Sequence, residues 1–271
     1  MNTVNFQQLE YEGWQRVAGF YKNTWATLTT RFISLLVNAT RIGAGMKVLD
    51  VACGPGYVAN AAAEKGAMAT GLDFSPEMIQ QARLNFPGIN FIEGNAQELP
   101  FEKNSFDAVL MNFGLLHLPS PETAMKEACR VLKKGGQYGY TIWAPPATSE
   151  GAKIMTEAIE RFGKKGITVP QAPDYYAYCS EQASKDVLSK AGFEKSSVHF
   201  ETIPVRWPVP DENFWFEAEM NAGVRTAYVL KQQDEISLGQ IRNAVISGIQ
   251  KFKTENGFEI PFTGHLVTAV K

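Results

Sequence analysis

The chain has 271 residues, of which 26 are basic and 28 acidic, so its formal net charge is -2 at pH 7. Apolar residues make up 45% of the sequence, enough to build a large core without disulfide or metal support. This composition excludes collagen-like, coiled-coil and disordered classes. The lack of a basic stripe argues against a nucleic-acid binder.

The cysteines and the N-terminal residues indicate the cellular compartment of the protein. Cys53, Cys129 and Cys179 are widely spaced and form no CxxC pair, which is typical of a reduced, cytoplasmic setting. Residues 1–6 lack a basic segment followed by an apolar run, so we expect no signal peptide. No run approaches the roughly 20 apolar residues that cross a bilayer, so we expect no stable membrane insertion.

Short apolar runs alternate with helical patterns between Lys47 and Trp143. The runs that predict strands are residues 48–52, 69–73, 89–92, 108–112 and 138–143. Several are nearly continuous in apolar residues, which is typical of a parallel sheet covered by helices on both faces.

Helix signals lie between these runs. Ser75-Pro76-Glu77 predicts a helix start, and Pro87-Gly88 ends that helix. Ser120-Pro121-Glu122 repeats the start, and Lys133-Lys134-Gly135-Gly136 is expected to end the second helix. The alternation of strands and helices predicts βαβ units and a doubly wound α/β sheet.

The flanking segments have other patterns. Further helices are expected around 154–162, 180–192 and 240–252, and further strands at 197–203 and 260–270, with Pro208 and Pro210 breaking the first of these two strands. We therefore expect residues 1–45 to form an N-terminal helical lid and residues 46–271 to form the α/β core. Helical insertions at about 145–179 and 208–257 would cover the active site. Trp14, Trp25, Trp207 and Trp215 fall in these segments, where they serve either the core or substrate contact.

A glycine turn follows the first predicted strand. Asp50 lies near the strand's end, and Gly54 and Gly56 precede a helix, so a ligand could approach both the backbone and free N–H groups. Asp73 ends the second strand, where a carboxylate can accept hydrogen bonds from both hydroxyls of a ribose. Alternatively, Asp73 caps the helix that starts near Ser75.

The same turn also fits a dinucleotide fingerprint. Gly54-x-Gly56-x-x-Ala59 keeps an NAD- or FAD-dependent oxidoreductase open. However, Asp50 would repel a pyrophosphate and attract a cationic amine. A ligand with an amine, a ribose and a base fits better, and S-adenosylmethionine has these groups.

Five motifs in order carry a family resemblance: Leu49–Gly56, Gly71–Met78, Gly94–Phe101, Ser105–Val109 and Arg130–Gly136. With them, the segment from Lys47 to Trp143 resembles class I S-adenosylmethionine-dependent methyltransferases, in particular the small-molecule branch that includes the ubiquinone/menaquinone C-methyltransferases. The resemblance implies a Rossmann-like sheet of seven mostly parallel strands, the last one antiparallel.

The resemblance also implies a set of cofactor contacts. The residues concerned are Tyr21, Asp50, Ala52, Cys53, Gly54, Gly56, Asp73, Phe74, Met78, Asn95, Ala96, Asn112 and Phe113. Asp50 would face the amino group and Asp73 the ribose. Phe74 and Met78 would lie near the adenine, and Asn112–Phe113 near the sulfonium.

Three positions in this set need a further remark. Asn95 stands where the family usually has Asp, and an Asn accepts from the adenine amino group without charge, so we expect weaker or differently tuned binding. Tyr21, together with Trp25, resembles the family's lid aromatics. Cys53 also fits a small packed residue in a tight turn.

Methyl transfer from a sulfonium is an in-line displacement, so the protein mainly aligns the reactants and excludes water. An acceptor hydroxyl or acidic carbon would need a base. His117, after the fourth strand, is the best candidate, with a loop histidine bonded to backbone as the alternative. His199 and His265 fall in strand patterns, and we expect no metal.

Three functions remain. The first is methyl transfer to a small apolar or aromatic acceptor, with S-adenosylhomocysteine as product. The second is an NAD-dependent oxidoreductase, disfavoured by Asp50. The third is a non-catalytic S-adenosylmethionine-binding protein. Nucleic-acid methylation is not expected, because Asn112-Phe113-Gly114-Leu115 lacks the Pro-Pro-aromatic continuation. A homodimer is among the assemblies that the sequence leaves open.

Overall fold

The structure is a computed structural model that describes residues 5–167 and 169–271. The expectation about residues 1–6 therefore lies largely outside the described residues. Two compact units are present. The helical unit contains the described residues of Met1–Leu28, Ala144–Ala172 and Ile203–Gly264, and the core unit contains Thr29–Trp143, Pro173–Thr202 and His265–Lys271.

The helices are α1 (Phe6–Tyr21), α2 (Ala26–Thr29), α3 (Ile33–Ala39), α4 (Tyr57–Glu64), α5 (Pro76–Asn85), α6 (Pro121–Val131), α7 (Glu150–Phe162), α8 (Glu181–Ala191), α9 (Phe214–Ala222), α10 (Arg225–Leu230) and α11 (Glu235–Ile249). The strands are β1 (Lys47–Val51), β2 (Met68–Asp73), β3 (Asn90–Glu93), β4 (Phe106–Asn112), β5 (Leu132–Trp143), β6 (His199–Val209), β7 (Lys253–Thr254) and β8 (Gly257–Val270). The single-turn 3-10 helices are η1 (Thr30–Phe32), η2 (Leu115–His117), η3 (Lys195–Ser197) and η4 (Gln250–Phe252).

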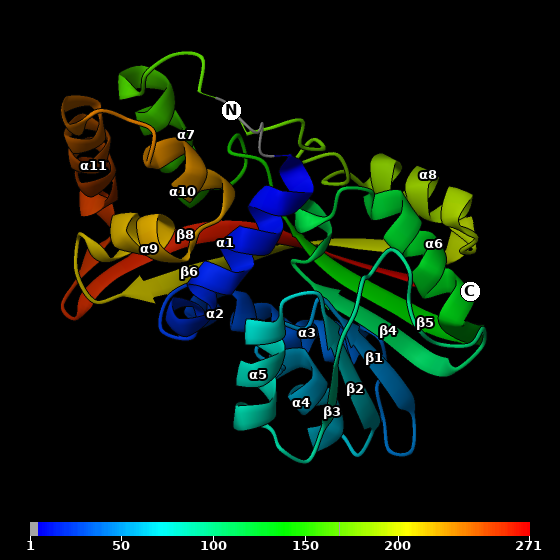
Figure 1. Ribbon diagram of the computed structural model, residues 1–271. Coiled ribbons are helices and arrows are strands. Elements are labelled where there is room, and N and C mark those ends of the chain that lie inside the picture. The colour runs from blue at the N-terminus through cyan, green and yellow to red at the C-terminus, as the bar shows by residue number, and fades with distance from the viewer. Residues whose placement is uncertain (1–4, 168) are drawn as a thin grey trace. The chain divides into compact units, whose positions relative to one another are not determined.

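One sheet has the strand order β3-β2-β1-β4-β5-β8-β6, and the short β7 pairs with β8 (Figure 1). The pairings among β1 to β5 are parallel. β8 runs antiparallel to β5, because Gly135 bonds to Lys271 at one end and Ala144 to Thr263 at the other. The predicted Rossmann-like sheet with an inserted antiparallel last strand is confirmed, and β7 is an additional short strand.

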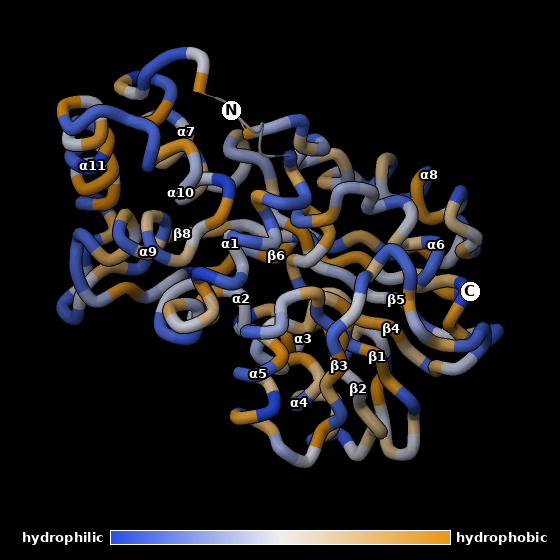
Figure 2. Tube along the Cα trace, viewed as in Figure 1, coloured by the Kyte–Doolittle hydropathy of each residue, from blue (hydrophilic) through white to orange (hydrophobic). Residues whose placement is uncertain are grey.

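Helices of the core unit cover both faces of this sheet. Tyr138 and Tyr140 of β5 belong to one buried cluster together with Leu188 of α8 and residues of α6. Gly139, between them, faces the other way, since a Cβ there would lie 2.8 Å from Leu36 of α3. The alternation explains why the central strands are largely apolar, as the orange stretches of β1 and β4 in Figure 2 show.

The helix starts follow the sequence more closely than the helix ends do. α5 begins at Pro76. The Ser75 hydroxyl accepts a hydrogen bond from the Met78 N–H, so Ser75 is the N-cap, as predicted. α6 begins at Pro121, but Ser120 makes no such capping bond. The prediction that residues 133–136 end this helix is wrong, because β5 already starts at Leu132. Lys133 instead pairs with Asp107 at the start of β4.

The strand predicted at residues 197–203 is longer in the structure. β6 continues to Val209 and includes Pro208. It ends the strand order of the sheet. A proline is tolerated in an edge strand, because its missing N–H costs no ladder bond on the open side.

The helical unit has its own aromatic core. Trp207 is fully buried and stacks on Trp25 with ring centroids 5.3 Å apart, and Trp215 meets Phe262 edge-on. α7 packs against α11 in the same unit. Among the described residues, no helix combines the length and apolarity needed to cross a bilayer.

Candidate cofactor site

The candidate site lies in the core unit, at the carboxyl ends of parallel strands. Asp73 and Asn112 are the last residues of β2 and β4, and Asp50 is one residue from the end of β1. The strand order reverses between β1 and β4. In doubly wound sheets, ligands bind in the crevice outside the carboxyl ends at such a switch point.

The two turn glycines have different tasks. Gly56 has a φ of 87°, and a Cβ there would lie 2.6 Å from the Phe91 ring, so this glycine allows α4 to pack closely. Gly54 also has a positive φ, but a Cβ there would meet no atom within 4 Å. The face of Gly54 is therefore open to a ligand that approaches the backbone.

Asp50 is buried beside this turn. One carboxylate oxygen, Oδ2, accepts from the Ala59 N–H in the first turn of α4 at 2.9 Å. No described residue donates a hydrogen bond to the other oxygen, Oδ1, although the side chain is only 1% exposed. Burial is the largest cause that raises the pKa of Asp50 well above its usual value. A buried carboxylate oxygen without a donor is costly unless a ligand or water supplies one.

Asp73 is buried one strand away. Its carboxylate accepts from the Ser75 N–H at 2.9 Å and from the Gly54 N–H at 2.8 Å. The N-cap of α5 is Ser75, so Asp73 does not cap this helix itself but accepts from the N–H of the cap residue. The bond to Gly54 joins Asp73 to the open turn. Burial raises the pKa of Asp73 to about 6, against the lowering effect of these backbone bonds. Each carboxylate oxygen can accept a second bond, so Asp73 keeps capacity for a ribose.

The two acids together favour a cationic ligand. Repulsion from Asp73 adds to the burial that raises the pKa of Asp50. A pyrophosphate placed here would add negative charge to a site that already disfavours its own carboxylates. An ammonium group at Asp50 and ribose hydroxyls at Asp73 would supply the missing donors. The residues therefore fit S-adenosylmethionine.

The residues predicted near the adenine lie around β2, α5 and the loop after β3. Phe74 is half-buried, whereas Met78 and Ala96 are buried. Asn95 is exposed, and its side-chain oxygen accepts from the Gln97 N–H at 2.9 Å. The bond makes Asn95 part of a local turn, and its contact with adenine stays a prediction.

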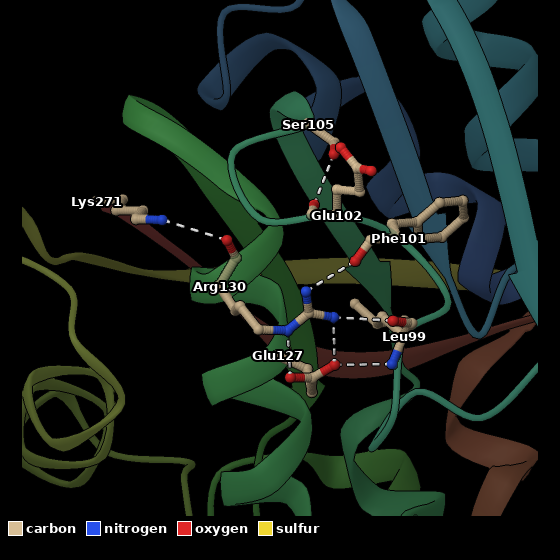
Figure 3. Close-up of polar contacts among 7 residues, drawn as sticks. All are labelled: Leu99, Phe101, Glu102, Ser105, Glu127, Arg130 and Lys271. Atoms are coloured by element: carbon tan, nitrogen blue, oxygen red, sulfur yellow. Dashed lines mark hydrogen bonds and ion pairs between the residues drawn. The ribbon is translucent and has the colours of Figure 1, made fainter.

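A charged clamp, formed by Glu127 and Arg130 of α6, holds this loop (Figure 3). Arg130 donates to the carbonyls of Leu99 and Phe101 at 2.8 and 2.7 Å. Glu127 accepts from the Leu99 N–H at 2.8 Å, and its hydrogen bonds with Arg130 lower its pKa. Lys271 donates to the Arg130 carbonyl in the same figure. α6 thereby fixes the loop that carries Asn95 and Ala96.

We expect Arg130→Met to weaken S-adenosylhomocysteine binding a few-fold and to lower the free energy of unfolding by about 1–2 kcal/mol, since charged hydrogen bonds of a partly exposed group are lost. Calorimetry and thermal unfolding measure the two effects. Lys133→Met is the matched control, because it breaks the pair with Asp107 and leaves the loop untouched. Equal effects of both variants on affinity would contradict the clamp.

The turn after β4 contains a left-handed residue and the candidate base. Phe113 has a φ of 56° and is buried, and Ala52 after β1 has a φ of 55°. Non-glycine residues rarely adopt this conformation, and they concentrate at functional sites. His117 is half-buried in η2, and its backbone N–H donates to the Gly114 carbonyl. The catalytic role of His117 stays a prediction.

Cys53 is packed rather than reactive. Its side chain belongs to a small buried cluster with Ala59, Ile79 and Phe91. Burial is the largest cause that raises the pKa of the Cys53 thiol, and Asp50 and Asp73 add to it. A thiol whose pKa is raised is protonated at neutral pH and a poor nucleophile. Among the described residues, no cluster of His, Cys, Asp and Glu could hold a metal ion.

Tyr21 and Trp25 belong to the helical unit. Tyr21 ends α1 and meets Trp14 edge-on at 5.7 Å, and Trp25 stacks on Trp207. Their predicted role over the cofactor stays a prediction.

One residue that the sequence analysis did not single out, Thr141, contacts both Asn112 and Phe113. The only signal in the sequence is a small polar residue within the mostly aromatic and apolar stretch 138–143.

The strand order defines a doubly wound α/β protein, and the open glycine turn and the two buried acids form its candidate nucleoside site. Residues 49–139 match a family described as a methyltransferase domain. The chain is 35% identical over 154 residues to a demethylmenaquinone methyltransferase of Paenarthrobacter aurescens, with 56% of this chain and 61% of the relative aligned. The chain therefore spans less than two thirds of that relative's length.

A ubiquinone/menaquinone biosynthesis C-methyltransferase of Allorhizobium ampelinum is 36% identical, with 58% of this chain and 68% of the relative aligned. The chain belongs to the class I S-adenosylmethionine-dependent methyltransferases and is similar to the ubiquinone/menaquinone C-methyltransferases. Among solved structures, the cyclase SpnF has a TM-score of 0.60 at 20% identity and covers 98% of this chain and 97% of its own. This likeness shows the fold alone.

Proposed function

We propose that the chain transfers a methyl group from S-adenosylmethionine to a small apolar or aromatic acceptor and releases S-adenosylhomocysteine. The observation that carries the proposal is the buried Oδ1 of Asp50, to which no described residue donates, in the strand that leads to the open backbone of Gly54. A zwitterionic nucleoside satisfies this oxygen, whereas a diphosphate would be repelled. The buried acid therefore disfavours the oxidoreductase alternative.

The chain's part in the reaction is binding and alignment. The sulfonium supplies an already activated methyl group. Asp50 and Asp73 bind the amine and the ribose, and the rigid ends of β1, β2 and β4 fix the angle of attack. Burial of these acids and of Phe113 keeps water away from the reacting centre. No metal takes part in this proposal.

Acceptor selection, location and assembly are separate proposals. We assign acceptor choice to residues 1–45 and to the insertions at about 145–179 and 208–257, because the matched family ends at residue 139. The relatives' names point to quinol-like acceptors. The three cysteines are unpaired, which supports a reducing, cytoplasmic setting. We propose no nucleic-acid partner and leave a homodimer to sedimentation measurements.

Binding and turnover experiments separate the three functions. Titration of the purified chain with S-adenosylhomocysteine and, separately, with NADH should give heat with the first ligand alone. Binding of NADH alone would favour the oxidoreductase. Turnover of methyl-labelled donor with a panel of phenols, quinols and amines then distinguishes an enzyme from a non-catalytic binder. A cyclase shares this fold, so turnover, and not fold, decides the matter.

We expect His117→Ala to slow turnover roughly 100-fold at pH 7 while S-adenosylhomocysteine affinity stays unchanged, if the accepted substrate needs a base. Steady-state kinetics and calorimetry measure the two quantities. His199→Ala is the control, because His199 is exposed on β6. An unchanged rate in His117→Ala with a phenol or quinol acceptor would remove His117 from the mechanism.

A further inference from the structure

A buried hydrogen-bond relay supports the turn after β4. The Phe113 N–H donates to the Thr141 hydroxyl at 3.0 Å, and that hydroxyl donates to the Asn112 side-chain oxygen at 2.6 Å. The Asn112 amide in turn donates to the Thr29 carbonyl at 3.2 Å. Thr141 is on β5 and is fully buried. One hydroxyl therefore links the ends of β4 and β5 to the segment before α3.

The relay holds a backbone that would otherwise relax. Phe113 is left-handed at a φ of 56°, a conformation that is unfavourable for a residue with a Cβ. Such a conformation persists only where the surroundings over-determine it. Thr141 holds the Phe113 N–H through its hydroxyl at 3.0 Å and through its backbone carbonyl at 3.3 Å, and only the hydroxyl bond depends on the side chain.

The backbone at Phe113 and Gly114 positions two packing contacts. The Phe113 ring stacks on Trp143 with centroids 3.9 Å apart, and Phe32 meets both rings edge-on. The next residue, Gly114, lies against Ala52, since a Cβ on Gly114 would come within 2.8 Å of the Ala52 Cβ. Ala52 is the left-handed residue that enters the glycine turn. The residue after β1 and the turn after β4 are thus in close contact, and each of these turns contains a left-handed residue.

We propose that Thr141 is a positioning residue for the methyl-bearing end of the cofactor. Its hydroxyl fixes Asn112, Phe113 and Gly114 against the glycine turn, without itself touching the ligand. This inference rests on the proposed function, because the turn after β4 is where the sulfonium is expected. The adenosine end depends on Asp73 and the loop held by Arg130, so Thr141 affects the two ends of the ligand differently.

The test compares ligands rather than rates, so no acceptor is needed. Thr141→Val removes the hydroxyl and keeps the shape. We expect its affinity for S-adenosylmethionine to fall roughly tenfold, the scale of one lost hydrogen bond, and its affinity for adenosine to stay within about twofold. Near-ultraviolet circular dichroism should change as well, since the Phe113–Trp143 stack loosens. Thr141→Ser, which keeps the hydroxyl, should restore both signals.

Controls separate this inference from the proposed function and from simple destabilisation. Thr40→Val removes another fully buried hydroxyl, which bonds only to the end of α3, and should lower the melting temperature without selective loss of S-adenosylmethionine affinity. Thr141→Ala removes the same hydroxyl with a smaller side chain, should Thr141→Val fail to fold. Equal losses for adenosine and S-adenosylmethionine, or no loss, overturn the inference. A native chain that binds neither S-adenosylmethionine nor S-adenosylhomocysteine overturns the proposed function first.

Discussion

Asp50→Asn is expected to weaken S-adenosylhomocysteine binding by at least roughly 30-fold while the melting temperature stays constant or rises. The interaction of a carboxylate with an ammonium group in a partly desolvated site is worth roughly 2–4 kcal/mol, which corresponds to this loss. Burial raises the pKa of Asp50, so its charge costs folding free energy at neutral pH. The neutral amide removes that cost, as is common where function opposes stability.

Asp107→Asn provides the matched control with the opposite signs. Asp107 accepts from Lys133 at 2.7 Å and from the Lys47 N–H at 2.8 Å, and these groups lower its pKa. Its loss should reduce stability by about 0.5–1 kcal/mol and leave ligand affinity unchanged. Calorimetry measures the ligand affinity of both variants, and thermal unfolding measures their stability. An Asp50→Asn variant that loses stability but keeps its affinity would contradict the amine assignment.

Asp73→Ala is expected to weaken S-adenosylhomocysteine binding roughly 100-fold or more. The variant loses the predicted ribose contacts, each a charged hydrogen bond of about 1.5–3 kcal/mol, together with the bonds that hold Gly54 and Ser75. Near-normal binding would count against the ribose assignment.

An analogue without the ribose 2′-hydroxyl separates direct contact from loss of the turn. In the native chain this analogue should bind more weakly than S-adenosylhomocysteine. In Asp73→Ala the two ligands should bind equally, because the partner of the hydroxyl is gone. A persistent preference for the hydroxyl in the variant would place the ribose elsewhere.

The pKa of Asp73, about 6, predicts a pH dependence with two opposite signs. Ligand affinity should fall as the pH drops from 7.5 to 5, since the protonated carboxyl accepts fewer hydrogen bonds. The contribution of Asp73 to stability should rise over the window from about 6 to about 4, because the folded chain binds the proton more tightly than the unfolded chain does. Calorimetry across this range on the native chain and Asp73→Asn measures the first effect, which should be smaller in the variant, where Asp50, whose pKa burial also raises, still titrates beside the ligand.

The location of the site was predictable because its signals are local. Asp50, the glycine turn and Asp73 lie within two successive strands and their connections, and the period of apolar residues places each acid at a strand end. The family fold and its strand alternation followed from the same patterns. The cap at Ser75 is equally local, since its hydroxyl bonds three residues ahead.

What the tertiary structure decided depends on partners that are remote in sequence. The free oxygen of Asp50 is known only once Ala59 is seen to occupy the other oxygen. β6 continues past Pro208 because its edge position leaves no ladder bond to lose. Residues 133–136 extend β5 because Leu132 pairs with Phe106 of β4 and the backbone of residues 135–136 bonds to Lys271 of β8. Thr141 reaches Asn112 across 29 positions, and Asn112 reaches Thr29 across 83. Hydrogen bonds over such separations leave no periodicity in the sequence, so only the folded chain reveals which polar groups are satisfied and which remain for a ligand.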